Sequence, residues 1–170
     1  MNPKTVLDKA RLIRLVLTDC DGVLTDGGVY YSERGEEFKR FHMRDGMAVE
    51  RLKKLADVET GIISGELSPS IRRRAEKLGI TECHLGIKDK PATVRSIAER
   101  LGMPLSAIAY IGDDVNDSEV FPLVGLSACP SDAMEAVRER ADMVCQLKGG
   151  EGAFREFAEV IVAARRGAAR

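Results

Sequence analysis

The sequence has no long hydrophobic run, no excess of basic residues and no closely spaced cysteines. Its 170 residues carry 26 Lys and Arg against 27 Asp and Glu, for a net charge of −1. This balance disfavours nucleic acid or a membrane surface as a partner. The longest apolar runs are too short to cross a bilayer, and we expect no signal peptide. We therefore expect a cytoplasmic globular protein.

The cysteines are few and scattered. The sequence places them at Cys20, Cys83, Cys129 and Cys145, with no zinc-type spacing, so we expect reduced thiols. Cys20 should point into the sheet, because side chains alternate along a strand, and a catalytic thiol is not expected there. At 44% apolar and 31% charged residues, residues 1–170 suffice for a single domain with a sound core.

Apolar runs alternate with segments of helical periodicity along the chain. We expect strands at 13–18, 58–63, 82–85, 107–111, 126–128 and 143–145. We expect helices at 45–56, 68–78, 89–101, 117–123, 132–139 and 153–164, with fraying of the first residues and from Arg165 onward. This alternation predicts an α/β fold, a Rossmann-like, mainly parallel sheet with helices on both faces.

One segment, residues 28–41, departs from the alternation. Two short runs, 29–32 and 37–41, flank a turn at 33–36, which predicts a protruding β-hairpin. The hairpin holds four of the eight aromatic residues, Tyr30, Tyr31, Phe38 and Phe41. These rings pack either on their own sheet or in a subunit interface, and we favour the interface.

Two carboxylates, Asp19 and Asp21, follow the first apolar run, and Gly22 supplies a turn. The carboxyl ends of strands in α/β sheets are where ligands bind. Like charges this close call for a cation, and oxygen ligands favour Mg²⁺. The alternative is an ordinary turn rich in Asp and Gly.

Three later segments also place polar side chains at strand-to-helix junctions. Ser64 ends the run 58–63, Lys90 opens a helical stretch, and Asp113 and Asp114 end the run 107–111, with Asp117 one turn later. Each has an ordinary alternative, as a helix cap, a solvated lysine or acids that complement a helix dipole. Their order along the chain favours one shared site.

These motifs resemble those of the haloacid dehalogenase superfamily of phosphohydrolases, over residues 11 to about 160. Segments 41–46, 72–79 and 149–156 are similar to its phosphatases of 3-deoxy-ulosonate phosphates. The resemblance implies a capless Mg²⁺-dependent phosphatase that works through an aspartyl-phosphate. The resemblance implies that Asp19 is the nucleophile and that Asp21 acts as acid and base. It implies that Ser64 and Lys90 contact the phosphoryl group, and that the metal is held by Asp19, Asp113 and the Asp21 carbonyl. Asp114 and Asp117 are the implied orienting residues.

The same resemblance implies a sugar-binding loop with Arg44, Asp45 and Gly46, joined by Gly65 and Arg74. Arg44 suits a sugar carboxylate. Phosphatases of 3-deoxy-D-manno-octulosonate 8-phosphate usually have Arg where this chain has Glu66. An acid there disfavours a nearby carboxylate, so we favour a nonulosonate 9-phosphate of the sialic-acid type, with the octulosonate 8-phosphate as the alternative.

The gaps between motifs are too short for a cap domain, so we expect the site to be closed by a neighbouring subunit. The resemblance implies a homotetramer with hairpins meeting at its centre. Two rivals differ in class: a phospho-acceptor signalling receiver, and a catalytically silent assembly module of a sialic-acid-activating pathway. The intact Asp19, Asp21, Lys90 and Asp113 argue against the silent module, and the placement of the acid pairs argues against the receiver.

Overall fold

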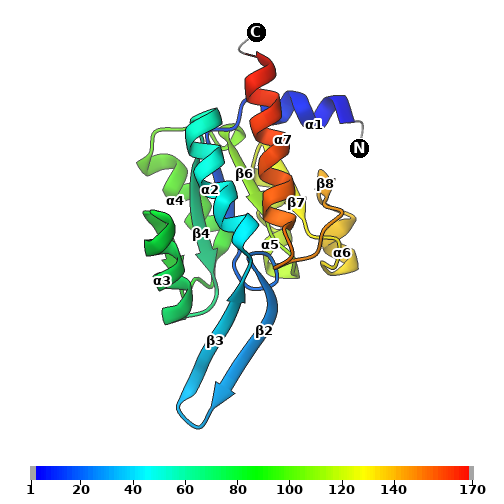
Figure 1. Ribbon diagram of the computed structural model, residues 1–170. Helices are drawn as coiled ribbons and strands as arrows, with labels where there is room; N and C mark the ends of the chain where they lie inside the picture. Colours follow the sequence, from blue (N-terminus) through cyan, green and yellow to red (C-terminus); the bar gives the residue numbers. More distant parts are fainter. Residues whose placement is uncertain (1–2, 169–170) are drawn as a thin grey trace.

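Parallel strands form the central sheet of the computed structural model, which describes residues 3–168 (Figure 1). The six strands lie in the order β5-β4-β1-β6-β7-β8. Their bounds are β1 Leu15–Thr18, β4 Glu59–Ser64, β5 Glu82–Leu85, β6 Ile108–Ile111, β7 Leu126–Cys129 and β8 Met143–Val144. The predicted α/β class with a mainly parallel sheet is confirmed.

Helices cover both faces of the sheet (Figure 1). The α-helices are α1 Pro3–Ala10, α2 Met43–Ala56, α3 Pro69–Leu78, α4 Lys90–Arg100, α5 Val115–Ser118, α6 Glu135–Arg138 and α7 Ala153–Ala168, with 3-10 turns η1 Leu105–Ala107 and η2 Phe121–Leu123. Alternation along β1 divides the core between the faces. Val16 packs in the cluster with α1, α2, α3 and α7, whereas Leu15 and Leu17 pack with α4, η2 and α6.

Strand β1 lies at the point where the direction of winding reverses. The chain goes from β1 to β4 on one side, continues outward to β5, and then crosses back to β6 on the other side of β1. In open α/β sheets such a reversal leaves a crevice at the carboxyl ends of the strands, where ligands bind. The loops after β1, β4 and β6 therefore meet at one rim.

The β-hairpin comprises β2 Thr25–Ser32 and β3 Gly35–Phe41 and extends away from the body (Figure 1). The predicted hairpin is confirmed, with β2 starting three residues before the expected residue 28. Three of its four rings do not pack on its own sheet: Tyr30, Tyr31 and Phe38 are 63%, 70% and 67% exposed, whereas Phe41 is partly buried against the core. The segment from β1 to α2 holds this hairpin and no further domain.

Several predicted helix bounds were wrong. In place of a helix over 117–123, α5 ends at Ser118 and η2 follows, because a capping box of Asp114 and Asp117 starts α5 early and Pro122 lacks an N–H. The expected helix 132–139 shrinks to α6, since Met134 N–H donates instead to the Asp113 carbonyl.

The two ends of the described chain are helical where we expected fraying. Helix α1 was missed, because eight residues give a weak periodic signal, and α7 continues past Arg165. The Arg165 guanidinium donates to the carbonyls of Ala56 and Arg11, which ties this turn to the body. Within residues 3–168, no helix has the length and apolar character needed to cross a bilayer.

Candidate active site

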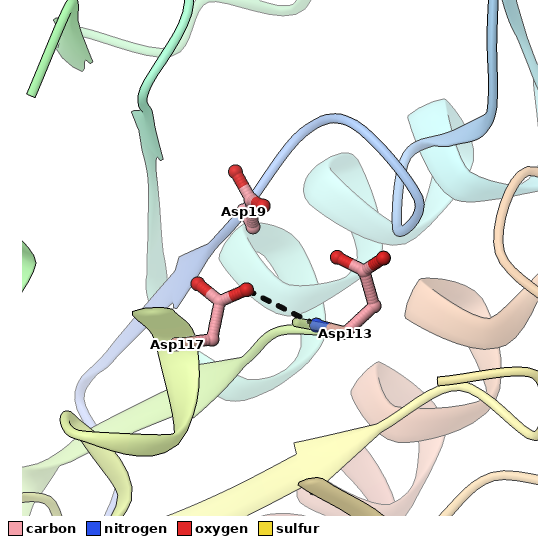
Figure 2. Close-up of side chains that lie close together, drawn as sticks. All are labelled: Asp19, Asp113 and Asp117. Carbon is pink, nitrogen blue, oxygen red and sulfur yellow. Dashed lines mark hydrogen bonds between the residues drawn. The ribbon is translucent and has the colours of Figure 1, made fainter. Parts of the chain in front are cut away.

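Three carboxylates from separate turns converge at the rim of the sheet (Figure 2). Asp19 follows β1, Asp113 follows β6, and Asp117 lies in α5. One oxygen from each lies within 4.8 Å of the others. Asp19 is 7% exposed and Asp117 is fully buried. The predicted convergence of the residue 19 and residue 113 loops is therefore present, and Asp117 belongs to the same cluster.

Gly22 allows this close approach. Its φ of 81° lies in the left-handed region, which glycine adopts without strain. A Cβ at this position would lie 2.0 Å from Asp113 Oδ2, so a side chain cannot be accommodated without moving that carboxylate. The residue 22 turn thus brings the first loop up against Asp113.

Lys90 is the cation of the cluster and is only 2% exposed. It opens α4, and its Nζ lies 2.6 Å from Asp117 Oδ1 and 3.2 Å from Asp19 Oδ2. Burial alone would lower the pKa of Lys90, but Asp19 and Asp117 outweigh it and the pKa is raised. Lys90 is therefore held as a cation beside Asp19.

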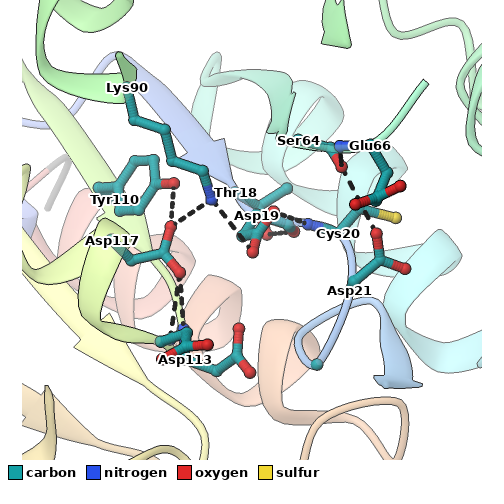
Figure 3. A network of polar contacts seen from close by, with 12 residues as sticks. Thr18, Asp19, Cys20, Asp21, Ser64, Glu66, Lys90, Tyr110, Asp113 and Asp117 are labelled. Atoms are coloured by element: carbon teal, nitrogen blue, oxygen red, sulfur yellow. Dashed lines mark hydrogen bonds and ion pairs between the residues drawn. The ribbon is translucent and has the colours of Figure 1, made fainter. Parts of the chain in front are cut away.

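Both carboxylate oxygens of Asp117 accept hydrogen bonds from other protein groups (Figure 3). Oδ1 accepts from Lys90 Nζ and from the Tyr110 hydroxyl, each at 2.6 Å, and Oδ2 accepts from the N–H groups of Asp113 and Asp114, each at 3.2 Å. Asp117 thus orients Lys90 and the residue 113 loop. Asp114 is exposed and caps α5. Tyr110 was missed; the only signal was a hydroxyl in an apolar strand.

The acidic cluster suits a divalent cation. Burial and the charges of Asp117 and Asp114 raise the pKa of Asp113 to about 7, and burial with the charge of Asp117 also raises the pKa of Asp19. Asp113 Oδ1 is buried without a hydrogen-bond partner among the described residues. A carboxylate that lacks a donor and a cluster of oxygen ligands both fit Mg²⁺, as the sequence predicted.

Asp21 lies on the other side of Asp19 from Lys90, beside Ser64 and Glu66 (Figure 3). Ser64 ends β4, is 1% exposed, and its Oγ lies 3.5 Å from Asp21 Oδ2. Asp21 Oδ1 accepts from Lys39 Nζ at 2.6 Å. Lys39 was not predicted as a site residue, although strand alternation places it on the face opposite Phe38.

The predicted substrate loop is divided between buried and exposed side chains. Arg44 is exposed. Asp45 is 2% exposed, and its Oδ1 accepts a hydrogen bond of 2.8 Å from the Arg155 N–H. This carboxylate therefore binds a backbone N–H in the first turn of α7. Arg74 donates to the His42 carbonyl, and a Cβ on Gly46 would lie 2.5 Å from its Nη2.

The remaining predicted substrate residues follow β4. Gly65 is half-buried and Glu66 is exposed. The Glu66 N–H donates to Ser64 Oγ at 3.1 Å, which ties this turn to the site. The 149–152 segment packs on its own chain's first loop: Gly150 N–H donates to the Val23 carbonyl at 2.9 Å.

The carboxylate cluster lies at the carboxyl ends of β1 and β6. A cavity of about 670 Å³ lies at the opposite, amino ends of the strands. It is lined by Arg14, which precedes β1, and by Glu59, the first residue of β4. Within residues 3–168, the chain forms one sheet with its helices and the hairpin, and no separate cap domain is present.

Comparisons with known proteins identify the family of this chain. A family profile described as haloacid dehalogenase-like hydrolase matches residues 66–155. The chain is 40% identical to the 3-deoxy-D-manno-octulosonate 8-phosphate phosphatase of Haemophilus influenzae, over 92% of this chain and 87% of that protein. The Escherichia coli K12 protein of the same name is 38% identical, over 94% and 85%.

Solved structures agree with this. The crystal structure of the Yersinia pestis phosphatase of that name superimposes with a TM-score of 0.92 at 37% identity, covering 95% of this chain and 87% of that chain. The Moraxella catarrhalis phosphatase, solved with magnesium ion, phosphate ion and KDO, gives 0.91 at 34%, covering 95% and 92%. This chain belongs to the haloacid dehalogenase-like hydrolases, and it is an enzyme of the phosphoric monoester hydrolase type.

Proposed function

We propose that this enzyme removes phosphate from a 3-deoxy-ulosonic acid phosphate through an aspartyl-phosphate formed on Asp19. The observation that carries the proposal is the placement of Asp19: a buried carboxylate at the sheet rim, 3.2 Å from Lys90 Nζ and clustered with Asp113. Relatives named for the octulosonate 8-phosphate share 40% and 38% identity over more than nine-tenths of the chain.

Asp19, Asp113 and the Asp21 carbonyl are the groups that would hold Mg²⁺. The Moraxella catarrhalis relative contains a magnesium ion, and a Haemophilus influenzae relative was solved in a cobalt-bound form. A divalent cation supplies positive charge that lowers the repulsion between an anionic nucleophile and an anionic substrate. The unpartnered Asp113 Oδ1 supports this assignment.

The protein groups divide the remaining work. Asp19 attacks phosphorus as the bond to the sugar oxygen breaks, and Asp21 gives that oxygen a proton. Asp21 then takes a proton from the water that cleaves the aspartyl-phosphate. Lys90 and the Ser64 hydroxyl hold phosphoryl oxygens, and both are already fixed by burial.

The substrate is 3-deoxy-D-manno-octulosonate 8-phosphate in this proposal, because that is the substrate in the relatives' names. This reverses the order that Glu66 alone favoured. A nonulosonate 9-phosphate is the second candidate, since the exposed Glu66 carboxylate beside Ser64 would disfavour a sugar carboxylate at that position and favour hydroxyl or amino groups there. In either case Arg44, exposed at the start of α2, is the proposed carboxylate partner.

The test compares kcat/KM on both sugar phosphates for the wild type and Glu66→Arg, with Asp19→Asn as the inactive control. We expect the octulosonate to be preferred by the wild type and more strongly by Glu66→Arg. Preference for the nonulosonate by the wild type, reduced in Glu66→Arg, would establish the second candidate. Phosphate release that persists in Asp19→Asn would contradict the proposed nucleophile, and no release by the wild type would favour a silent assembly module.

We further propose a cytoplasmic homotetramer in which exposed hairpin rings meet and a neighbour closes the open site. The exposed Tyr30, Tyr31 and Phe38 support an interface, and all four cysteines are free. Light scattering after size exclusion should give four chains for the wild type and fewer for Tyr31→Glu. A wild type that elutes as a monomer would contradict this arrangement.

A further inference from the structure

Lys39 is the most deeply buried basic side chain of the hairpin. Its neighbours Phe38 and Arg40 are exposed, whereas the Lys39 side chain is only 1% exposed. Alternation along β3 points it away from them, and its Nζ meets Asp21 Oδ1 at 2.6 Å. A buried ammonium requires such a partner, and the placement brings a hairpin charge into contact with the proposed acid and base.

The ion pair is anchored to a third part of the fold. Glu36 lies three residues earlier on the same strand, and its Oε2 is 3.5 Å from Lys39 Nζ. Glu36 Oε1 also accepts a hydrogen bond from the Ser68 hydroxyl, and that hydroxyl caps α3. Lys39 is thus held between the loop after β1 and the start of α3.

The chemistry of the pair distinguishes the two oxygens of Asp21. An ammonium only donates hydrogen bonds, so the oxygen facing Lys39 must accept, and a proton on Asp21 must lie on Oδ2. Oδ2 is the oxygen 3.5 Å from Ser64 Oγ, on the side of the proposed phosphate position. Two carboxylates face the Lys39 ammonium, Asp21 Oδ1 at 2.6 Å and Glu36 Oε2 at 3.5 Å, and both stabilise its charged form.

We propose that Lys39 is a positioning residue that places the transferable proton of Asp21 on Oδ2, toward the phosphate site. The inference rests on the proposed function. In the first step, the Asp21 Oδ2–H proton moves to the sugar oxygen while the bond from phosphorus to that oxygen breaks and the bond from Asp19 to phosphorus forms. In the second, Oδ2 takes a proton from water while the bond from the water oxygen to phosphorus forms and the bond from Asp19 to phosphorus breaks, which releases phosphate. Lys39 stays protonated throughout.

The test is the dependence of kcat on leaving-group acidity, measured with a series of aryl and alkyl phosphates and Mg²⁺. Good leaving groups need no proton, whereas alkoxides do. We expect a shallow dependence in the wild type and a steep one in Asp21→Asn and Lys39→Met. Alkyl phosphates should lose about 10–100-fold in Lys39→Met, with much smaller losses for aryl phosphates. Lys39→Arg, which keeps a charged donor, should restore the shallow dependence.

Arg40→Met is the matched control. Arg40 is an exposed neighbour of Lys39 on β3, and the substitution removes its ion pair with Asp26 of β2. It should keep the wild-type dependence. A uniform loss on all substrates in Lys39→Met would show a merely structural role and overturn the inference. A shallow dependence in Asp21→Asn would instead overturn the proposed acid itself. Melting curves establish folding, and if Lys39→Met does not fold, Lys39→Gln is expected to give an intermediate slope.

Discussion

The Tyr110 hydroxyl donates a 2.6 Å hydrogen bond to Asp117 Oδ1, the oxygen that also accepts from Lys90. Tyr110 is fully buried. Tyr110→Phe removes a donor to a charged group, so the free energy of unfolding should fall by about 1.5–3 kcal/mol in urea titrations. Tyr31→Phe, at an exposed ring, is the control and should be near neutral. Equal stabilities for both variants would mean that this bond contributes nothing.

Replacing Lys90 should damage both stability and activity. Lys90→Met leaves Asp19 and Asp117 without their cation, so the free energy of unfolding should fall by about 3–5 kcal/mol. Phosphatase activity should fall by about 10²–10³-fold, because a charge facing the phosphoryl group is lost. The exposed Lys88, two residues earlier, provides the control variant Lys88→Met. Activity retained in a folded Lys90→Met would disprove this role.

Gly22→Ala tests the close packing of the first loop against Asp113. Its Cβ would clash with Asp113 Oδ2, so we expect weaker Mg²⁺ binding and lower activity, measured by calorimetry and phosphate release. Gly79→Ala is the control: its φ of 69° is also left-handed, but nothing lies within 4 Å of the added Cβ. Both variants share backbone strain. Only Gly22→Ala should lose metal affinity, and equal affinities would contradict the packing argument.

The raised pKa of Asp113 predicts a pH dependence of stability in metal-free protein. Its value of about 7 exceeds the ordinary 3.8, so the folded state binds more protons than the unfolded chain between these limits. The resulting stabilisation is fully present below about pH 4 and is lost as pH rises through about 7. Asp113→Asn should flatten this slope in urea titrations, whereas Asp57→Asn, at an exposed position, should not.

Added Mg²⁺ should reverse this trend, because its ligands must be deprotonated. The rise in Tm on adding Mg²⁺ should therefore be larger at about pH 8 than at about pH 5.5. An equal rise at both would mean that the cation does not bind the carboxylate cluster.

The sequence predicted the sheet, the hairpin and the carboxylate rim because each depends on local patterns. Asp19 and Asp113 were found from their positions after apolar strands. The short helix α5 and the 3-10 turn η2 were misjudged, since a capping box and a proline there act through single hydrogen bonds that periodicity does not detect.

Contacts between distant segments were harder to predict. Nothing in the local pattern around Asp45 indicates that its carboxylate receives the Arg155 N–H, 110 residues away. The pairing of Lys39 with Asp21 likewise depends on how the base of the hairpin lies against the first loop. Such roles follow from tertiary packing, which a single sequence constrains only weakly.

The central claim is that Asp19 carries the phosphoryl group during turnover. Rapid acid quenching of the enzyme with Mg²⁺ and octulosonate 8-phosphate, followed by peptide mass spectrometry, tests it most directly. We predict a peptide heavier by one phosphoryl group at Asp19, absent in Asp19→Asn. Turnover with no phosphorylated Asp19 peptide at any quench time, or the adduct on another residue, would contradict the account.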